Sequence, residues 1–277
     1  MNDYRRVVTV QDISCFGQCS ITVALPVLSA CGVETVILPG ALLSTHTGGF
    51  HDVYIRDLTE DMRRIAEHWQ REGILFDAVY SGYLGSAEQI GIVREVRKNL
   101  TRPGALLVTD PAMADNGRLY SGFDAAFVEK MKGLCAEADI LLPNITEACL
   151  LTDTPYRETY DAAFASGLAR ALAEAGAKHV VLTGVSFGEK TTGVLVRMGN
   201  EERYYEHRRI AGGCHGTGDA FASAFLGALL RGKDIFGAAG IAAEFVLACI
   251  THTAGDPEHR YGAKFETALP ELIAMLK

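Results

Sequence analysis

Short apolar runs rich in β-branched residues alternate along the chain with longer segments that have a helical spacing of apolar positions. Continuous apolar runs of this kind are typical of parallel strands that are buried on both faces. Strands are expected at residues 7–11, 35–38, 78–81, 106–109, 140–143 and 179–183. The alternation predicts βαβ crossovers, and therefore an α/β fold with a mostly parallel central sheet and helices on both faces.

The clearest helix signals lie between the second and fourth of these strands. Residues 60–72 follow Thr59, a candidate N-cap, and are followed by Gly73. Residues 87–99 follow Ser86, another candidate N-cap. An N-cap hydroxyl before the segment and a glycine after it are typical helix boundaries.

Residues 191–210 break the alternation. Two strand-like segments, 192–197 and 203–206, flank Met198-Gly199-Asn200, which predicts an antiparallel hairpin on the sheet edge. Three more helices are expected after it, at residues 219–231, 235–253 and 267–276. Since no repeat, low-complexity tract or linker interrupts the pattern, we expect a single domain over residues 1–277.

Composition narrows the functional classes. The chain has 277 residues, near the upper limit of roughly 250–300 for one hydrophobic core. Its 48% hydrophobic and 22% charged residues are typical of a globular protein. A formal net charge of −8 argues against nucleic acid as a partner, because nucleic-acid binders present basic patches.

Localisation follows from the termini and the cysteines. The apolar run 7–10 is shorter than a signal-peptide core, and the stretch 235–250 is interrupted by Glu244 and short of a membrane span. Neither secretion nor membrane contact is therefore expected. Seven cysteines without a Cys-x-x-Cys pattern do not form a disulfide framework, which predicts reduced thiols in the cytoplasm.

Polar residues gather where the predicted strands end. Ligands of open α/β sheets bind at the carboxyl ends of the strands, so these residues are the candidates for a site. In chain order they are Asp12, Ser14 and Gly17, then 44–49, 81–86, Asp110-Pro111, 143–147, Thr183-Gly184 and 212–219.

The last of these groups, Gly212-Gly213-Cys214-His215-Gly216-Thr217-Gly218-Asp219, opens a predicted helix. Backbone N–H groups in such a loop wrap an anion, and the helix dipole adds to the attraction. The pattern indicates a phosphate cradle with Asp219 beside it, placed to take a proton from an attacking hydroxyl. The alternative is that the glycines only turn the chain and Asp219 only caps the helix.

Asp110 and Glu147 also follow predicted strands. Two carboxylates at one sheet edge suit a Mg²⁺ ion that bridges phosphates. The alternatives are a turn residue for Asp110 and a first-turn helix acid for Glu147. Other nucleotide motifs are absent: no G-x-G-x-x-G occurs, and Gly188-Glu189-Lys190-Thr191 only approximates a P-loop.

At these residues the chain resembles the ribokinase superfamily, and within it the pyridoxal kinases. Gly216-Thr217-Gly218-Asp219 marks the superfamily, whereas Ser44-Thr45-His46-Thr47 and Ser81-Gly82-Tyr83-Leu84-Gly85-Ser86 mark the branch. Asp110-Pro111-Ala112-Met113 and the string Pro143-Asn144-x-x-Glu147 keep the family's order. The resemblance implies a three-layer α/β/α sandwich, usually a homodimer, that phosphorylates the 5′-hydroxymethyl group of vitamin B6 with ATP. It also implies a response to K⁺, which many members of the family show.

The resemblance also implies roles for the matching residues. Asp219 is the base, and Gly216, Thr217 and Gly218 form the anion hole for the transferring phosphoryl group. Asp110 and Glu147 organise Mg²⁺. Further roles fall to Asn144 at phosphate or metal-bound water, Thr183 at the triphosphate, Tyr120 over the nucleotide, and Thr47 and Tyr83 around the pyridine ring.

Two departures from the family concern the substrate. The string Gln11-Asp12-Ile13-Ser14 replaces the family's Gln-Ser-His, so either Asp12 or Ser14 takes the substrate contact, and an aspartate could pair with a protonated nitrogen. Thr45 stands where the family often has Asn. His46 either orients the substrate or is structural. Cys214 either packs as a small apolar group or reacts with the pyridoxal aldehyde.

Rival functions come from two classes. The nearest enzyme is hydroxymethylpyrimidine kinase of the same superfamily, a branch that commonly has Cys in place of Asp219. Sugar kinases usually insert a longer lid after the first strand, and none is evident here. A non-catalytic nucleotide-binding module is the alternative of another class, and the retained Asp219 argues against it.

Overall fold

A central sheet and two helical layers make up the computed structural model, which describes residues 4–210 and 214–277. Within these ranges the main sheet has nine strands in the spatial order β11-β10-β9-β8-β5-β4-β1-β2-β3, and β6 and β7 form a small separate ribbon. The strands are β1 (Arg6–Phe16), β2 (Glu34–Thr45), β3 (Ile55–Asp57), β4 (Phe76–Ser81), β5 (Thr101–Thr109), β6 (Ala114–Asp115), β7 (Arg118–Leu119), β8 (Ile140–Leu141), β9 (His179–Val185), β10 (Thr191–Met198) and β11 (Glu201–Arg208).

The central strands of the main sheet are parallel. β1 pairs in parallel with β2 and β4, and the parallel pairing continues through β5, β8 and β9. Antiparallel pairing is confined to the edges, at β3 on one side and at the β10–β11 hairpin on the other. The predicted mostly parallel sheet and its edge hairpin are confirmed.

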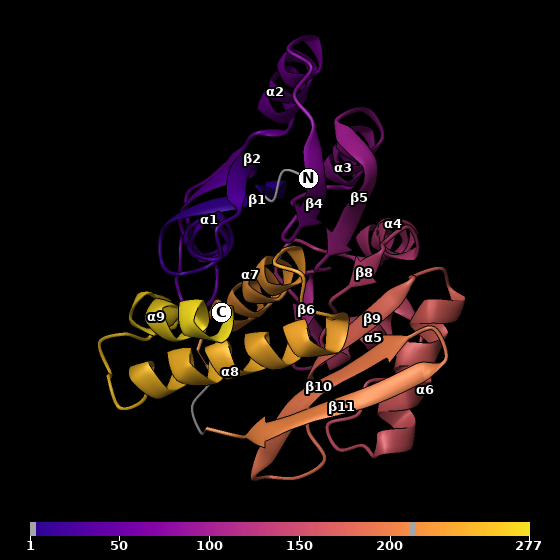
Figure 1. The fold of residues 1–277 in the computed structure, drawn as a ribbon, viewed down its shortest axis with the longest axis vertical. Helices are drawn as coiled ribbons and strands as arrows, with labels where there is room; N and C mark the ends of the chain where they lie inside the picture. The colour runs from indigo at the N-terminus through magenta and orange to yellow at the C-terminus, as the bar shows by residue number, and fades with distance from the viewer. Residues whose placement is uncertain (1–3, 211–213) are drawn as a thin grey trace.

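Helices cover both faces of the sheet, which confirms the predicted α/β/α sandwich (Figure 1). One face packs against α1 (Ile21–Ala30), α7 (Thr217–Leu230), α8 (Ile235–Thr253) and α9 (Phe265–Met275). The other face packs against α2 (Thr59–Arg71), α3 (Ala87–Asn99), α4 (Ala125–Ala136), α5 (Ile145–Leu151) and α6 (Ala162–Glu174).

Successive residues of a strand supply the two apolar cores in turn. Val7 packs with the α7 side and Val8 with the α3 side, as Tyr80 and Val79 do in β4. All four side chains are fully buried. This two-sided burial is the reason that the parallel strands are continuous apolar runs in the sequence.

Two expected boundaries are corrected by the structure. β1 continues through Asp12 and Ser14 to Phe16, because β2 pairs with it as far as Thr45 after an irregularity near residue 12. Asp12 and Ser14 therefore lie within the strand rather than after it. Thr59 is not an N-cap: α2 begins at Thr59 itself, and the Asp57 carboxylate accepts hydrogen bonds from its N–H and hydroxyl.

Ser86 caps α3 as predicted, since its hydroxyl accepts a hydrogen bond from the Gln89 N–H. The helix α8 has a mean hydropathy of 1.7 over 18 residues and meets the length and composition of a membrane span. Its buried residues, among them Ala242 and Phe245, pack in the core beside α7, as the core helix of a globular domain does. All seven cysteines are free.

Candidate active site

A cavity of about 610 Å³ opens at the carboxyl ends of the parallel strands, between β1, β2, β5 and the start of α7. Every site residue expected from the sequence lines it, although these residues come from segments far apart in the chain. They are Asp12, Ser14, His46, Thr47, Tyr83, Asp110, Tyr120, Asn144, Glu147, Thr183, Gly216, Thr217, Gly218 and Asp219. The structure thus brings the residues together, and their individual roles remain predictions.

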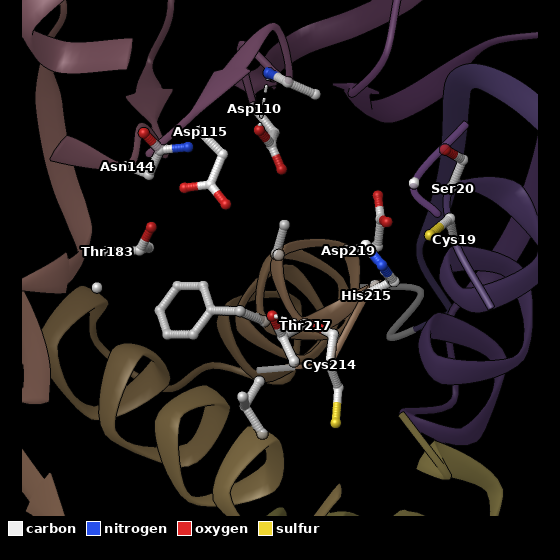
Figure 2. Close-up of a pocket in the computed structure, with 18 of the residues that line it drawn as sticks. Cys19, Ser20, Asp110, Asp115, Asn144, Thr183, Cys214, His215, Thr217 and Asp219 are labelled. Atoms are coloured by element: carbon white, nitrogen blue, oxygen red, sulfur yellow. Dashed lines mark hydrogen bonds between the residues drawn. The ribbon is translucent and has the colours of Figure 1, made fainter. Parts of the chain in front are cut away.

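The start of α7 forms one wall of the cavity (Figure 2). Gly216 is its N-cap with φ 75°, and a Cβ built there would lie 1.8 Å from the Gln18 carbonyl oxygen. Only glycine fits this left-handed, crowded position. The next N–H groups have no partner inside the helix, so they are available to an anion. Gly212 and Gly213 of the predicted cradle lie outside the described residues.

Asp219 stands in the first turn of α7 and lines the cavity. Removal from water raises the pKa of its carboxyl to about 7, and the nearby negative charge of Asp110 adds to the rise. The nearby backbone N–H of Ser20 acts in the opposite direction and lowers the pKa of Asp219. A carboxylate with a pKa near neutrality is suited to accept a proton from a hydroxyl group.

Asp110 and Glu147 form a second acidic pair. Burial raises the pKa of both carboxyls, and for Asp110 the charge of Glu147 raises it further. The Asp110 Oδ1 accepts the Ala112 N–H at 3.1 Å. Glu147 accepts two backbone N–H groups, from Met113 at 3.0 Å and from Asn144 at 2.9 Å.

Asn144 and Glu147 make a complete capping box at the start of α5. The Asn144 Oδ1 accepts the Glu147 N–H at 2.9 Å, and its Nδ2 donates to the Ala114 carbonyl at 2.8 Å. The hydrogen bonds therefore support the alternative that Glu147 is a structural acid in the first turn of a helix. It does not exclude a ligand role, because each carboxylate oxygen has a second lone pair. Thr183 lies beside Asn144 through an isolated bridge and donates to the Pro143 carbonyl at 3.3 Å.

Among the described residues, the acidic side chains in the cavity are not balanced by lysine or arginine. Five carboxyl groups line it, and no lysine or arginine does among the described residues. The carboxyls are those of Asp12, Asp110, Asp115, Glu147 and Asp219. Such a wall repels a polyphosphate unless cations accompany it. The part of the chain that the structure describes has no group of three or more His, Cys, Asp or Glu side chains that could hold a metal by themselves.

Asp115 is a cavity residue that the sequence reasoning missed. Figure 2 shows its carboxylate turned into the cavity between Asp110 and Asn144. The backbone N–H and the side-chain amide of Asn116 both donate to it. Its position five residues after Asp110, at the end of β6, was the available signal.

The substrate side of the cavity is built around Asp12, whose side chain is buried. It accepts the Ser14 hydroxyl at 2.9 Å and lies near Tyr83. Both ring nitrogens of His46 have partners: Nδ1 accepts the Gly48 N–H at 3.1 Å, and Nε2 lies 2.7 Å from the Tyr261 carbonyl. This arrangement supports the structural alternative for His46.

Other lining residues were also missed. Cys19 and Ser20 precede α1, and His207 lies on β11. Apolar side chains complete the wall: Leu43, Leu142, Val194, Phe221, Ala222, Ala243, Val246 and Ile250. No local sequence signal marks the apolar group, because these residues are read as core.

Comparison with known proteins gives a consistent result. Residues 12–263 match the family described as phosphomethylpyrimidine kinase. A pyridoxine/pyridoxal/pyridoxamine kinase of Bordetella avium is 28% identical over 243 residues, which are 83% of this chain and 79% of that protein.

Solved structures of other proteins are similar to this one over nearly the whole chain. A Bacteroides thetaiotaomicron protein, provisionally assigned as a phosphomethylpyrimidine kinase and crystallised with pyridoxal, is 35% identical with a TM-score of 0.91, covering 97% of this chain and 96% of its own. The pyridoxal kinase of Lactobacillus plantarum is 32% identical with a TM-score of 0.89, covering 98% and 97%. The chain therefore belongs to the phosphomethylpyrimidine kinase family, and it is a kinase with the fold of the pyridoxal kinases of the ribokinase superfamily.

Proposed function

We propose that this kinase transfers the γ-phosphoryl group of ATP to the 5′-hydroxymethyl group of a vitamin B6 compound. The observation that carries the proposal is the position of Asp219, beside the helix start that would hold the phosphates and in the same cavity as Asp12, Thr47 and Tyr83. Similarity to kinases named for pyridoxal supports the choice of substrate.

The residues account for each part of the transfer. The substrate hydroxyl gives its proton to the Asp219 carboxylate while its oxygen attacks the γ-phosphorus, and ADP leaves. Backbone N–H groups of Gly218 and Thr217 face the transferring phosphoryl and offset its negative charge. Asn144 and Thr183 lie on the side of the cavity expected for the nucleotide.

The chemistry of the wall fits Mg²⁺. Carboxylate oxygens are the ligands that this ion prefers, and it usually keeps several waters. Asp110 and Glu147 would hold it together with waters and phosphate oxygens, and the Asp115 carboxylate lines the same cavity. When bound, it neutralises charge on the β- and γ-phosphates. We therefore propose Mg²⁺ as the cofactor. A K⁺ response, a homodimer and a cytoplasmic location stay predictions from the sequence.

Hydroxymethylpyrimidine is the second candidate substrate. The family description and the assignment of the Bacteroides thetaiotaomicron protein favour it. Both substrate classes are flat nitrogen heterocycles with a hydroxymethyl group, so the reaction at Asp219 would be the same. A non-catalytic nucleotide-binding role is disfavoured, because burying Asp219 beside Asp110 costs free energy that catalysis would justify.

The test is ATP consumption by one enzyme preparation with pyridoxal, pyridoxine, pyridoxamine, hydroxymethylpyrimidine and ribose. We expect the highest kcat/KM with a vitamin B6 compound, and product analysis should find a 5′-phosphate. Excess chelator should abolish turnover. A higher kcat/KM with the pyrimidine would overturn the vitamin B6 proposal, and turnover in excess chelator would overturn the Mg²⁺ proposal.

A further inference from the structure

The Asp12 carboxyl is a buried acid without a cationic partner. Its residue is 4% exposed, the Ser14 hydroxyl donates to it at 2.9 Å, and the Ser20 hydroxyl acts to lower its pKa. No ion pair within residues 4–210 and 214–277 involves Asp12. His46 lies close enough to act on the Asp12 carboxyl, but its ring nitrogens already contact Gly48 and Tyr261. Burying such an acid is costly, so a ligand that donates a charged N–H to it gains a strong hydrogen bond.

Ser20 connects Asp12 to the proposed base. Its hydroxyl acts to lower the pKa of Asp12, and its backbone N–H acts to lower the pKa of Asp219, so Ser20 lies beside both carboxyls. Ser20 has φ 55° and ψ −131°, an unfavourable conformation for a residue with a side chain, and it pairs with Ile13 of β1 through an isolated bridge. Figure 2 shows Ser20 beside Asp219 at the start of α1. The carboxyls of Asp12 and Asp219 therefore both lie close to Ser20.

Asp12 and Asp219 line the same cavity and lie close enough for the charge of Asp12 to act on Asp219. A planar ring whose hydroxymethyl group reaches Asp219 would then present its neighbouring ring substituent to Asp12. In pyridoxamine that substituent is an aminomethyl group, which is protonated at neutral pH. In pyridoxine it is a second hydroxymethyl group. In hydroxymethylpyrimidine it is an amino group.

We infer that Asp12 is a specificity-determining residue that accepts an N–H hydrogen bond from the substituent next to the reacting hydroxymethyl group. The inference rests on the proposed transfer to a hydroxymethyl group at Asp219. It predicts that the amine-bearing member of any matched substrate pair is preferred. Tyr83, which lies close to Asp12, would pack against the ring.

The experiment compares pyridoxamine with pyridoxine, because they differ only at this substituent. In the wild type, kcat/KM should be higher for pyridoxamine. In Asp12→Asn, the ratio of the two values should fall at least about tenfold, as expected for loss of a charge-assisted hydrogen bond. The control is Asp61→Asn, the same chemical change at an exposed position of α2, and it should leave the ratio unchanged.

Calorimetric binding of the two ligands to the wild type without ATP gives a second measurement. It depends neither on turnover nor on whether a variant folds. The wild type should bind pyridoxamine more tightly than pyridoxine. Equal wild-type affinities, or equal losses for both ligands in Asp12→Asn, would overturn the inference.

A pyrimidine pair separates this inference from the proposed function. Hydroxymethylpyrimidine is compared with the analogue that has a hydroxyl in place of its amino group. If no vitamin B6 compound is phosphorylated, but Asp12→Asn removes a preference for the aminopyrimidine, then the vitamin B6 proposal fails and the role of Asp12 stands. If Asp12→Asn leaves the ratio unchanged in both pairs, the role of Asp12 fails whichever substrate is used.

Discussion

Asp219 has a carboxylate neighbour, Asp110, and no lysine or arginine of the described residues lines the cavity around it. The free energy of its charged form is raised, which makes it a better proton acceptor than an exposed aspartate. Replacing it with asparagine removes the acceptor while it keeps nearly the same shape. The substitution of Asp219 by asparagine therefore tests proton transfer separately from ligand binding.

We expect Asp219→Asn to lower kcat by about 10²–10⁴, the usual contribution of a positioned general base. Nucleotide affinity, measured by calorimetry, should stay close to that of the wild type, because the N–H groups at the start of α7 are unchanged. Asp61→Asn serves as the matched surface control. Near wild-type turnover in Asp219→Asn would remove this residue from the mechanism.

For single residues, the sequence predicted site membership where the type of side chain itself indicates the chemistry. Asp110, Glu147 and Asp219 follow strands or open helices, so their arrival at one cavity could be predicted. Ser20 could not, because its importance comes from a backbone angle and from its position beside two carboxyls of the fold, Asp12 and Asp219. The alternatives for His46 could be weighed only when its two ring contacts were visible.

At the scale of elements, two helix starts build the nucleotide side of the cavity. Gly216 caps α7 in a left-handed conformation, and Asn144 and Glu147 cap α5. At both helix starts the cap determines where the backbone N–H groups of the first turn point, or provides hydrogen-bond acceptors for them. Substitutions at these positions therefore change stability and ligand binding together.

Gly216→Ala should lower both stability and activity. The left-handed conformation alone costs about 1–2 kcal/mol for a residue with a Cβ, and that atom would meet the Gln18 carbonyl at 1.8 Å. Gly218→Ala is the comparison, because its nearest contact would be Asp110 Oδ2 at 3.9 Å. Thermal unfolding should show a clear decrease only for Gly216→Ala, and equal decreases would contradict the assignment of strain to Gly216.

Glu147→Gln should destabilise the protein by about 1–3 kcal/mol, because a side-chain NH₂ would replace an oxygen that accepts a backbone N–H. The Mg²⁺ dependence of its turnover should also weaken. Asp115→Asn is the comparison: Asp115 is exposed, so stability should be unchanged while the Mg²⁺ concentration for half-maximal activity rises. Chemical denaturation and Mg²⁺ titrations measure the two effects. An unchanged titration in both variants would exclude these carboxylates from metal binding.

The sequence predicted strands better than helices. The strands are buried on both faces, so their apolar runs stand out against the polar loops. Four helices, α1, α4, α5 and α6, had no predicted bounds, and α5 entered only through the alternative that Glu147 is a first-turn helix acid. Helix α1 is almost wholly apolar and contains Pro26, so it lacks the polar stripe by which a surface helix is found. The polar residues Asp12 and Ser14 concealed the second half of β1.

At the scale of the whole molecule, the acidic cavity links folding to pH. Burial raises the pKa of Asp110, Glu147 and Asp219 above that of an exposed carboxyl. Between the unfolded pKa near 4 and the folded values near neutrality, the folded protein binds more protons than the unfolded chain. The free energy of unfolding therefore decreases as pH rises through this window.

The metal-free protein should consequently have a higher Tm at pH 6 than at pH 8, measured by differential scanning calorimetry in chelator. Asp110→Asn should flatten this dependence, because it removes one of the titrating groups. Mg²⁺ with ATP should reduce the difference by binding the charged carboxylates at pH 8. A Tm that rises from pH 6 to pH 8 in chelator would contradict the raised pKa values.

The position of Ser20 has a consequence for how this enzyme can change over evolution. Since Ser20 lies beside both Asp12 and Asp219 and acts on the pKa of each, a substitution that alters substrate choice at position 12 is expected also to disturb the group that activates the hydroxyl. Mutations at the two sites should then be epistatic: the effect of one depends on the state of the other. A new substrate range would have to be reached through paired changes around the β1–α1 turn rather than by single steps.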